Sequence, residues 1–109
     1  MDRRKDTMTT TTPLSMPASF DAFAAEATAQ GFDEVLSRSW PADAVLDTHT
    51  HAFGVSAVVV AGELWLTVGA QTRHLQAGDR FTLDPDVPHA ERYGPAGATY
   101  WVARRNPVP

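Results

Sequence analysis

The chain has 109 residues, a formal net charge of −4 and no cysteine. A chain of this length builds one hydrophobic core, and 43% hydrophobic residues favour a globular fold over disorder. The acidic balance argues against nucleic-acid binding, which needs clustered Lys and Arg, and no apolar run approaches membrane-spanning length. Without cysteine, disulfides, thiolate metal sites and a cysteine nucleophile are excluded. Any metal would therefore be held by imidazole and oxygen.

The N-terminal residues 1–17 are predicted to form an unstructured leader. A run of four threonines at Thr9–Thr12 is followed by Pro13 and Pro17, a composition that buries too little surface to become ordered. The basic start of this segment is not followed by an apolar stretch, so no secretory signal is predicted and a cytoplasmic protein is expected. The folded domain is expected to span residues 18–109.

One short amphipathic helix is predicted at the start of this domain. Ser19 suits the N-cap, and Gly31 supplies a C-terminal stop. The apolar residues between them fall on one helix face, which is expected to pack against a sheet or against a second subunit: Phe20, Phe23, Ala24 and Ala27.

From Phe32 onward the sequence consists of short runs rich in Val, Leu, Thr and aromatic residues, separated by turn-type clusters. About eight strands without intervening helices predict an all-β sandwich or barrel. The predicted strands are Phe32–Trp40, Val45–His51, Val55–Val60, Leu64–Val68, Gln71–Leu75, Arg80–Leu83, His89–Tyr93 and Ala98–Ala103. The predicted turns between them include Ala61–Gly62 and Gly94–Gly97.

Two histidines one residue apart, His49 and His51, mark a candidate metal site. On a regular strand they point to the same side and can share one cation. His89 follows a proline-rich turn and would have to arrive from another strand. Imidazole groups are common ligands of transition metals, although a His-x-His pair also occurs among surface histidines.

Glu91 lies two residues after His89, so on a regular strand it shares the inward face. A carboxylate inside a barrel is costly unless it pairs or coordinates, and it is a candidate general acid or base. The alternative is an ion pair with an arginine such as Arg38, Arg80 or Arg104.

Several further residues have simpler expected roles. His74 is expected on the surface, and Asp79 is expected to brace its turn. Asp47 is a candidate for orienting a ligand imidazole. Of the adjacent residues Tyr100 and Trp101, only one can point inward and shape a pocket wall.

The stretch from about Val45 to Tyr93 resembles the two-motif signature of the cupins, which are small double-stranded β-helix (jelly-roll) barrels. The first motif is matched at His49, His51 and Gly62, whereas its Glu position falls at Val55. The second motif is matched at Gly78, Asp79, Pro85, Pro88 and His89, with Asp84 and Asp86 in place of the Pro and Gly most often seen. The resemblance implies an all-β cupin barrel and, because small cupins generally pair, a homodimer.

The resemblance further implies that His49, His51 and His89 face into the barrel and bind a divalent transition metal, commonly iron, with zinc, manganese, nickel or copper in other members. Three neutral ligands leave the ion its full charge, which favours an anionic, chelating small molecule such as an enolate. The first hypothesis is thus an iron-dependent, dioxygenase-like enzyme in which Glu91 handles a proton. The second is a non-catalytic sensor, with or without metal, resembling the cupin portion of sugar-responsive transcription regulators.

Overall fold

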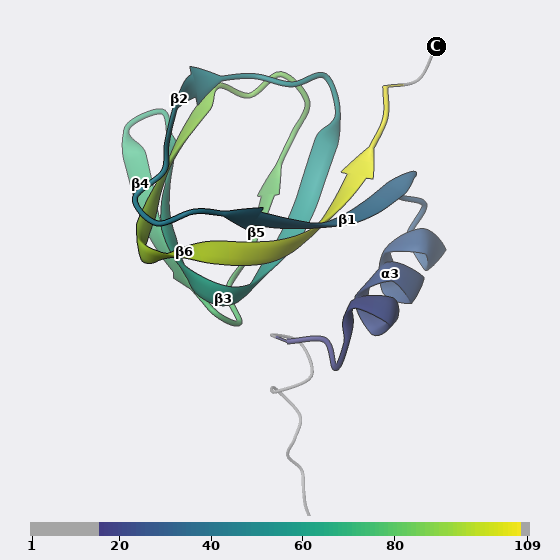
Figure 1. The fold of residues 1–109 in the computed structure, drawn as a ribbon. Helices are drawn as coiled ribbons and strands as arrows, with labels where there is room; N and C mark the ends of the chain where they lie inside the picture. The colour runs from purple at the N-terminus through teal and green to yellow at the C-terminus, as the bar shows by residue number, and fades with distance from the viewer. Residues whose placement is uncertain (1–15, 108–109) are drawn as a thin grey trace, which may run out of the picture.

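The computed structural model describes residues 16–107, so almost all of the predicted leader lies outside the described residues. One helix, α3 (Phe20–Ala29), precedes a curved antiparallel sheet that closes into a jelly-roll barrel (Figure 1). The strands are β1 (Glu34–Trp40), β2 (Val45–His49), β3 (Gly54–Val68), β4 (Gln71–Gln76), β5 (Arg80–Leu83) and β6 (His89–Arg105). The all-β prediction with one short N-terminal helix is confirmed. The described residues contain no helix long and apolar enough to cross a membrane.

Helix α3 begins and ends where the sequence predicts. The hydroxyl of Ser19 accepts a hydrogen bond from the backbone N–H of Ala22 at 3.0 Å, and Gly31 adopts a φ of +89° just beyond the last turn. Phe23 and Ala27 are buried against the outside of the barrel (Figure 1). The apolar stripe therefore packs against the chain's own sheet.

The strands pair in the order β1-β6-β3-β4, with β2 also paired to β6 and β5 also paired to β3. The first half of β6 pairs with β2 and its second half with β1, and β3 likewise pairs with β5 and then with β4. Each long strand thus changes one of its partners along its length, β6 from β2 to β1 and β3 from β5 to β4. The inward faces of these strands enclose one apolar core.

The prediction of eight strands is wrong in two places, because two pairs of predicted strands are continuous. Strand β3 runs through the predicted turn at Ala61–Gly62, and β6 runs through the predicted turn at Gly94–Gly97. The ladder between β3 and β6 shifts register on both sides of this region but continues to pair beyond it. A bulge bends a strand without ending it, so the turn-forming residues mark barrel corners.

Glycine is required at these corners by both conformation and space. Gly62 has a φ of +73° and Gly97 a φ of +69°, a region that residues with a Cβ rarely adopt. A Cβ on Gly62 would overlap the carbonyl oxygen of Gly97, and a Cβ on Gly97 would overlap that of Trp40. Three backbone segments therefore meet at one corner with no room for a side chain.

Candidate metal centre

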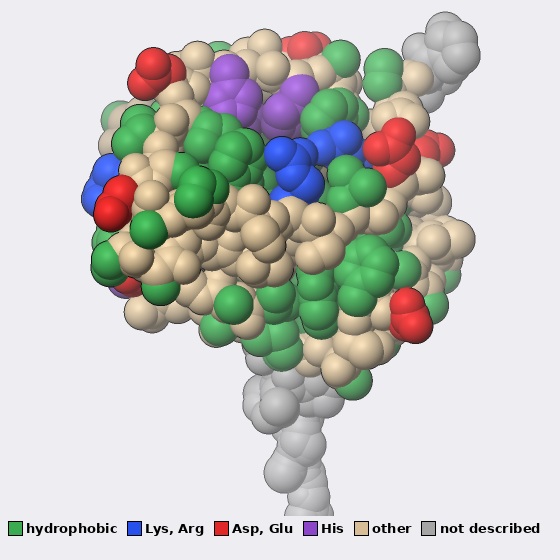
Figure 2. Space-filling model, viewed as in Figure 1, with side chains coloured by type: hydrophobic (Ala, Val, Ile, Leu, Met, Phe, Trp, Pro, Cys, Tyr) green, Lys and Arg blue, Asp and Glu red, His purple; other side chains and the backbone are tan. Residues whose placement is uncertain are grey.

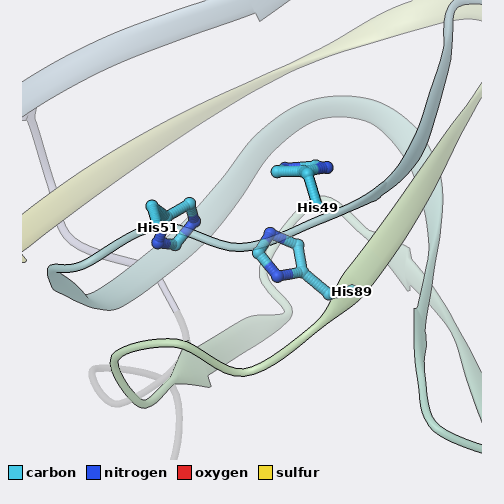
Figure 3. A group of neighbouring side chains, drawn as sticks. All are labelled: His49, His51 and His89. Atoms are coloured by element: carbon cyan, nitrogen blue, oxygen red, sulfur yellow. The ribbon is translucent and has the colours of Figure 1, made fainter.

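The three predicted histidines converge at one end of the barrel. His49 is the last residue of β2, and His89 is the first residue of β6 and its register partner. The ring centroids of His49 and His89 are 4.3 Å apart, and those of His51 and His89 are 4.8 Å apart (Figure 3). One candidate ligand nitrogen from each ring lies within 4.8 Å of the other two.

His51 reaches this cluster by a different route from the one predicted. The sequence predicts a strand that continues to His51, but β2 ends at His49 and His51 lies in the following loop. Strand alternation therefore does not orient its ring. Instead, its backbone carbonyl accepts from the N–H of Asp86 at 2.8 Å, and its ring stacks on Phe53 with centroids 4.2 Å apart.

Each imidazole has its Nδ1 within hydrogen-bonding distance of a backbone carbonyl two residues away. The acceptors are Asp47 for His49 at 2.7 Å, Phe53 for His51 at 3.2 Å and Val87 for His89 at 2.8 Å. A ring that donates its Nδ1–H to a carbonyl leaves the Nε2 lone pair free for a metal. Asp47 thus orients a histidine as predicted, but through its main chain. Three such rings form a donor set that suits a divalent transition metal ion.

The surroundings of His51 favour its neutral, metal-binding form. Burial lowers the pKa of the His51 imidazole, and the neighbouring His89, His49 and Arg104 lower it further, against the opposing effect of the hydrogen bond to the Phe53 carbonyl. A neutral ring keeps the lone pair that a metal ion requires.

Glu91 faces inward as predicted, with its side chain only 11% exposed. One carboxylate oxygen lies 3.7 Å from Nε2 of His49 and 3.6 Å from Nε2 of His89. The other oxygen accepts a hydrogen bond from the hydroxyl of Tyr93. The structure therefore places a carboxylate beside the three imidazoles although the first cupin motif lacks its Glu.

The alternative in which Glu91 pairs with an arginine is not observed among the described residues. Arg80 lies 3.9 Å from Glu26 and Arg104 lies 3.6 Å from Glu34, whereas the partner of Glu91 is a tyrosine.

A pocket of about 240 Å³ opens beside His49 and His51. Figure 2 shows histidine side chains on one face of the molecule, next to basic and hydrophobic ones. The polar lining of the pocket is His49, His51, Glu91, Arg38 and Arg104, and its remaining walls are Trp40, Leu46, Phe53, Val55, Phe81, Leu83, Tyr100 and Val102. At the position of the motif Glu, the pocket thus has the apolar side chain of Val55.

The adjacent aromatic residues of β6 divide between the two faces. Tyr100 lines the pocket and accepts a hydrogen bond from the indole N–H of Trp40 at 3.2 Å. Trp101 faces the helix and contacts Phe20 and Phe23 at centroid distances of 5.9 and 6.1 Å. The fourth histidine, His74, is an exposed partner of Glu63 at 2.6 Å, as a surface role predicts.

Two features of the site were missed by sequence reasoning. One is Tyr93, whose hydroxyl donates a hydrogen bond to Glu91. Strand alternation from His89 through Glu91 could have placed Tyr93 on the same face. Arg38 and Arg104 are predicted from the sequence only as partners for Glu91, because their place in the pocket depends on the pairing of β1 with β6.

Comparison with solved structures supports the cupin fold. A RmlC-like cupin from Shewanella frigidimarina is 26% identical with a TM-score of 0.58, covering 64% of this chain and 62% of that one. The DMSP lyase DddQ from Ruegeria pomeroyi is 24% identical with a TM-score of 0.62, covering 68% of this chain and 38% of that one. The cupin domain of an XRE family transcriptional regulator from Enterobacter cloacae is 20% identical with a TM-score of 0.58, covering 68% and 81%.

The chain spans less than two thirds of the length of the first two of these structures. Comparison with curated proteins finds no match. Among family models, that of the AraC-like ligand binding domain matches residues 24–105, which includes all six strands and every residue of the histidine cluster. The chain therefore belongs to the family of AraC-like ligand-binding domains and has the cupin fold.

Proposed function

We propose that this protein is a metal-binding cupin in which His49, His51 and His89 hold one divalent transition metal ion beside a small-molecule pocket. The observation that carries this proposal is the shared arrangement of the rings. One candidate ligand nitrogen from each ring lies within 4.8 Å of the other two, and each Nδ1 lies within hydrogen-bonding distance of a main-chain carbonyl. A neutral ring that donates from Nδ1 keeps a lone pair on its other nitrogen, which is the atom that a metal ion binds.

Iron is the first candidate for the ion, and imidazole ligands also suit zinc, manganese, nickel and copper. When bound, the ion would polarise oxygen atoms of a chelating ligand and, as iron, would support dioxygenase-type oxidation. The remaining features of the site belong to the chain itself. Its pocket is walled by aromatic and aliphatic side chains, which exclude water from a small ligand.

Glu91 is the residue that we propose to move a proton. Its carboxylate faces the same space as His49 and His89, so it can accept a proton from a ligand bound beside them. Tyr93 fixes the carboxylate by donating its hydroxyl hydrogen. Burial, followed by the neighbouring Tyr100 and Glu91, raises the pKa of Tyr93, so this hydroxyl stays a donor at neutral pH.

Metal analysis of tag-free protein tests the metal proposal. After reconstitution with iron(II) without oxygen, or with zinc, the wild-type protein is expected to hold about one equivalent of metal. The variants His89→Ala and His49→Ala are expected to lose most of it, whereas His74→Ala removes a histidine outside the cluster and should retain it. Circular dichroism verifies that each variant is folded.

Two results would overturn this proposal. One is a wild-type protein that takes up less than about a tenth of an equivalent of any of these metals after reconstitution. The other is equal metal content in the folded His49→Ala variant and the wild type.

A second candidate function is a non-catalytic ligand sensor, which the family match to an AraC-like ligand-binding domain favours. The similarity to the cupin domain of a transcriptional regulator is in keeping with it. A sensor would bind its small molecule in the same pocket and leave it unchanged. Absence of metal uptake with retained ligand binding would select this function.

We further propose a cytoplasmic location and, because small cupins generally pair, a homodimer. Light scattering should then give about twice the chain mass of 11.8 kDa, and a monomer at micromolar concentration would contradict it.

A further inference from the structure

Two arginines from different strands line the same pocket as His49 and His51. Arg104 follows Tyr100 and Val102 at alternate positions of β6, so all three face the pocket. Arg38 on β1 is the register partner of Tyr100 and lines the same pocket. The barrel therefore brings two guanidinium groups to one wall of a small cavity.

Each guanidinium lies against an aromatic ring. Arg104 is 4.5 Å from the centre of the Phe53 ring, and that ring stacks in parallel on His51. Arg38 is 5.1 Å from the centre of the Trp40 ring, whose indole is bonded to Tyr100. Stacking on an aromatic face restricts an arginine while leaving its N–H edge free to donate. The Phe53 ring of the first stack lies between the Arg104 guanidinium and His51, one of the three clustered histidines.

The protein itself does not use up the donors of these arginines. Nε of Arg104 is buried without a hydrogen-bond partner, and its ion pair with the half-exposed Glu34 is long, at 3.6 Å. Arg38 has no ion pair among the described residues. Buried N–H groups normally have an acceptor. Two arginine Nε atoms lack one among the described residues, those of Arg80 and Arg104, and only Arg104 lines this pocket.

The charge of the pocket lining indicates that a group bound beside these arginines is negatively charged. Two guanidinium groups face one carboxylate, and that carboxylate, Glu91, is held by Tyr93. The register partner of Arg104 on β3 is Val55, whereas on β1 it is Glu34, which lies 3.6 Å from Arg104 but does not line the pocket. The lining has excess positive charge even before a metal ion is counted.

We infer that the ligand of this pocket is a small carboxylate, whose carboxyl group Arg38 and Arg104 bind while its other oxygen atoms face the histidines. Planar guanidinium groups match carboxylates in shape and charge. The volume of about 240 Å³ lies below that of sites for drug-sized molecules, which restricts the ligand to a small acid. The orientation of the ligand rests on the proposed metal function, whereas recognition of the carboxyl group does not.

A matched pair of diketones tests this inference. Acetylacetone and acetopyruvate carry the same chelating diketone, but only acetopyruvate has a carboxylate. Isothermal titration into zinc-loaded protein, which avoids oxidation, is expected to show acetopyruvate binding at least about tenfold more tightly. In Arg38→Gln and in Arg104→Gln this preference should fall to about threefold or less.

Arg92→Gln is the control, because Arg92 lies on the same strand as Arg104 but faces outward over Trp65 at 4.2 Å. It should keep the full preference. Equal binding of the two diketones by the wild type overturns the inference. So does a preference that persists in both folded pocket variants, because the carboxylate would then bind the zinc ion alone.

Zinc titration without ligand separates this inference from the metal proposal. If the wild type binds zinc but shows no carboxylate preference, the metal function stands and the inference falls. If the wild type binds no zinc, acetopyruvate is titrated into the metal-free protein. Binding that is lost in both arginine variants then supports the inference alone, and absence of binding overturns it.

Discussion

At the scale of single residues, the unusual feature of the site is the origin of its carboxylate. Val55 occupies the position at which the first cupin motif has Glu, and it leaves an apolar wall. Glu91 approaches the imidazoles from β6 instead. The carboxylate is thus adjacent to the histidines but is bonded to Tyr93, an arrangement that favours proton transfer over tight metal ligation.

Substitution of Glu91 by Gln tests this role. In zinc-loaded protein, the rate at which acetylacetone forms its enolate should fall about 10²–10⁴-fold, because an amide cannot accept the proton. Stopped-flow absorbance measures this rate, and metal analysis should find unchanged zinc. Glu63→Gln, which removes an acid paired with His74 outside the site, is the control. An unchanged rate in the Glu91→Gln variant would remove Glu91 from the mechanism.

The candidate ligands and Glu91 could be predicted because His-x-His and His-x-Glu each lie within three residues, although His51 reaches the cluster from a loop and not by strand alternation. The resemblance to the cupins then joined the two segments. The arginines could not be predicted in the same way, because Arg38 and Arg104 lie far apart in sequence and meet only through the β1–β6 pairing. Tyr93 could be predicted in part. Strand alternation predicts which face of β6 it lies on, but not its hydrogen bond to Glu91.

At the scale of elements, the corner between β3 and β6 is the feature most sensitive to mutation. Gly62 and Gly97 combine positive φ with close backbone contact, whereas Gly69 has a φ of +60° and nothing within 4 Å of the place that a Cβ would take. Substitution at Gly69 therefore tests the free-energy cost of a left-handed backbone conformation alone. Substitution at Gly62 or Gly97 adds the cost of steric overlap.

Substitution by alanine should reveal the difference. Gly69→Ala is expected to lower the free energy of unfolding by about 1–2 kcal/mol, because only the left-handed conformation is penalised. Gly62→Ala is expected to cost about 2–5 kcal/mol, because its methyl group also overlaps the carbonyl of Gly97. Urea denaturation measures both values. Equal losses would show that the corner can open to accept a side chain.

The positions of the helix and strand segments could be predicted from the sequence, but their joining at this corner could not. Helix α3 and the positions of the strand segments follow from caps, alternation and turn residues. The joining of segments into β3 and β6 does not, because Ala61–Gly62 reads equally well as a turn or as a bulge. Long-range pairing with the opposite strand decides between them.

At the scale of the whole molecule, stability should depend on alkaline pH through the only two tyrosines in the chain, Tyr93 and Tyr100. Burial is the main cause that raises the pKa of each hydroxyl. Below a pH of about 10 both phenols are protonated in the folded and unfolded chains. Above it the unfolded chain loses protons first, so the free energy of unfolding should fall as pH rises.

Two measurements check this dependence. The folded protein should show little phenolate absorbance at pH values where the chain unfolded in guanidinium already titrates, at about 10. Urea denaturation between about pH 8 and pH 11 should show decreasing stability over the upper part of that range. A folded protein whose phenols ionise at the ordinary pKa would contradict the burial argument.

The bonds from the three Nδ1 atoms to main-chain carbonyls have a consequence for mutational tolerance. Every residue, whatever its side chain, supplies a carbonyl, so replacing Asp47 or Val87 leaves the acceptors of His49 and His89 intact. The orientation of these rings therefore does not depend on the side chains next to them in the sequence. Substitutions that reshape ligand preference can accumulate in the pocket walls while the geometry of the centre persists.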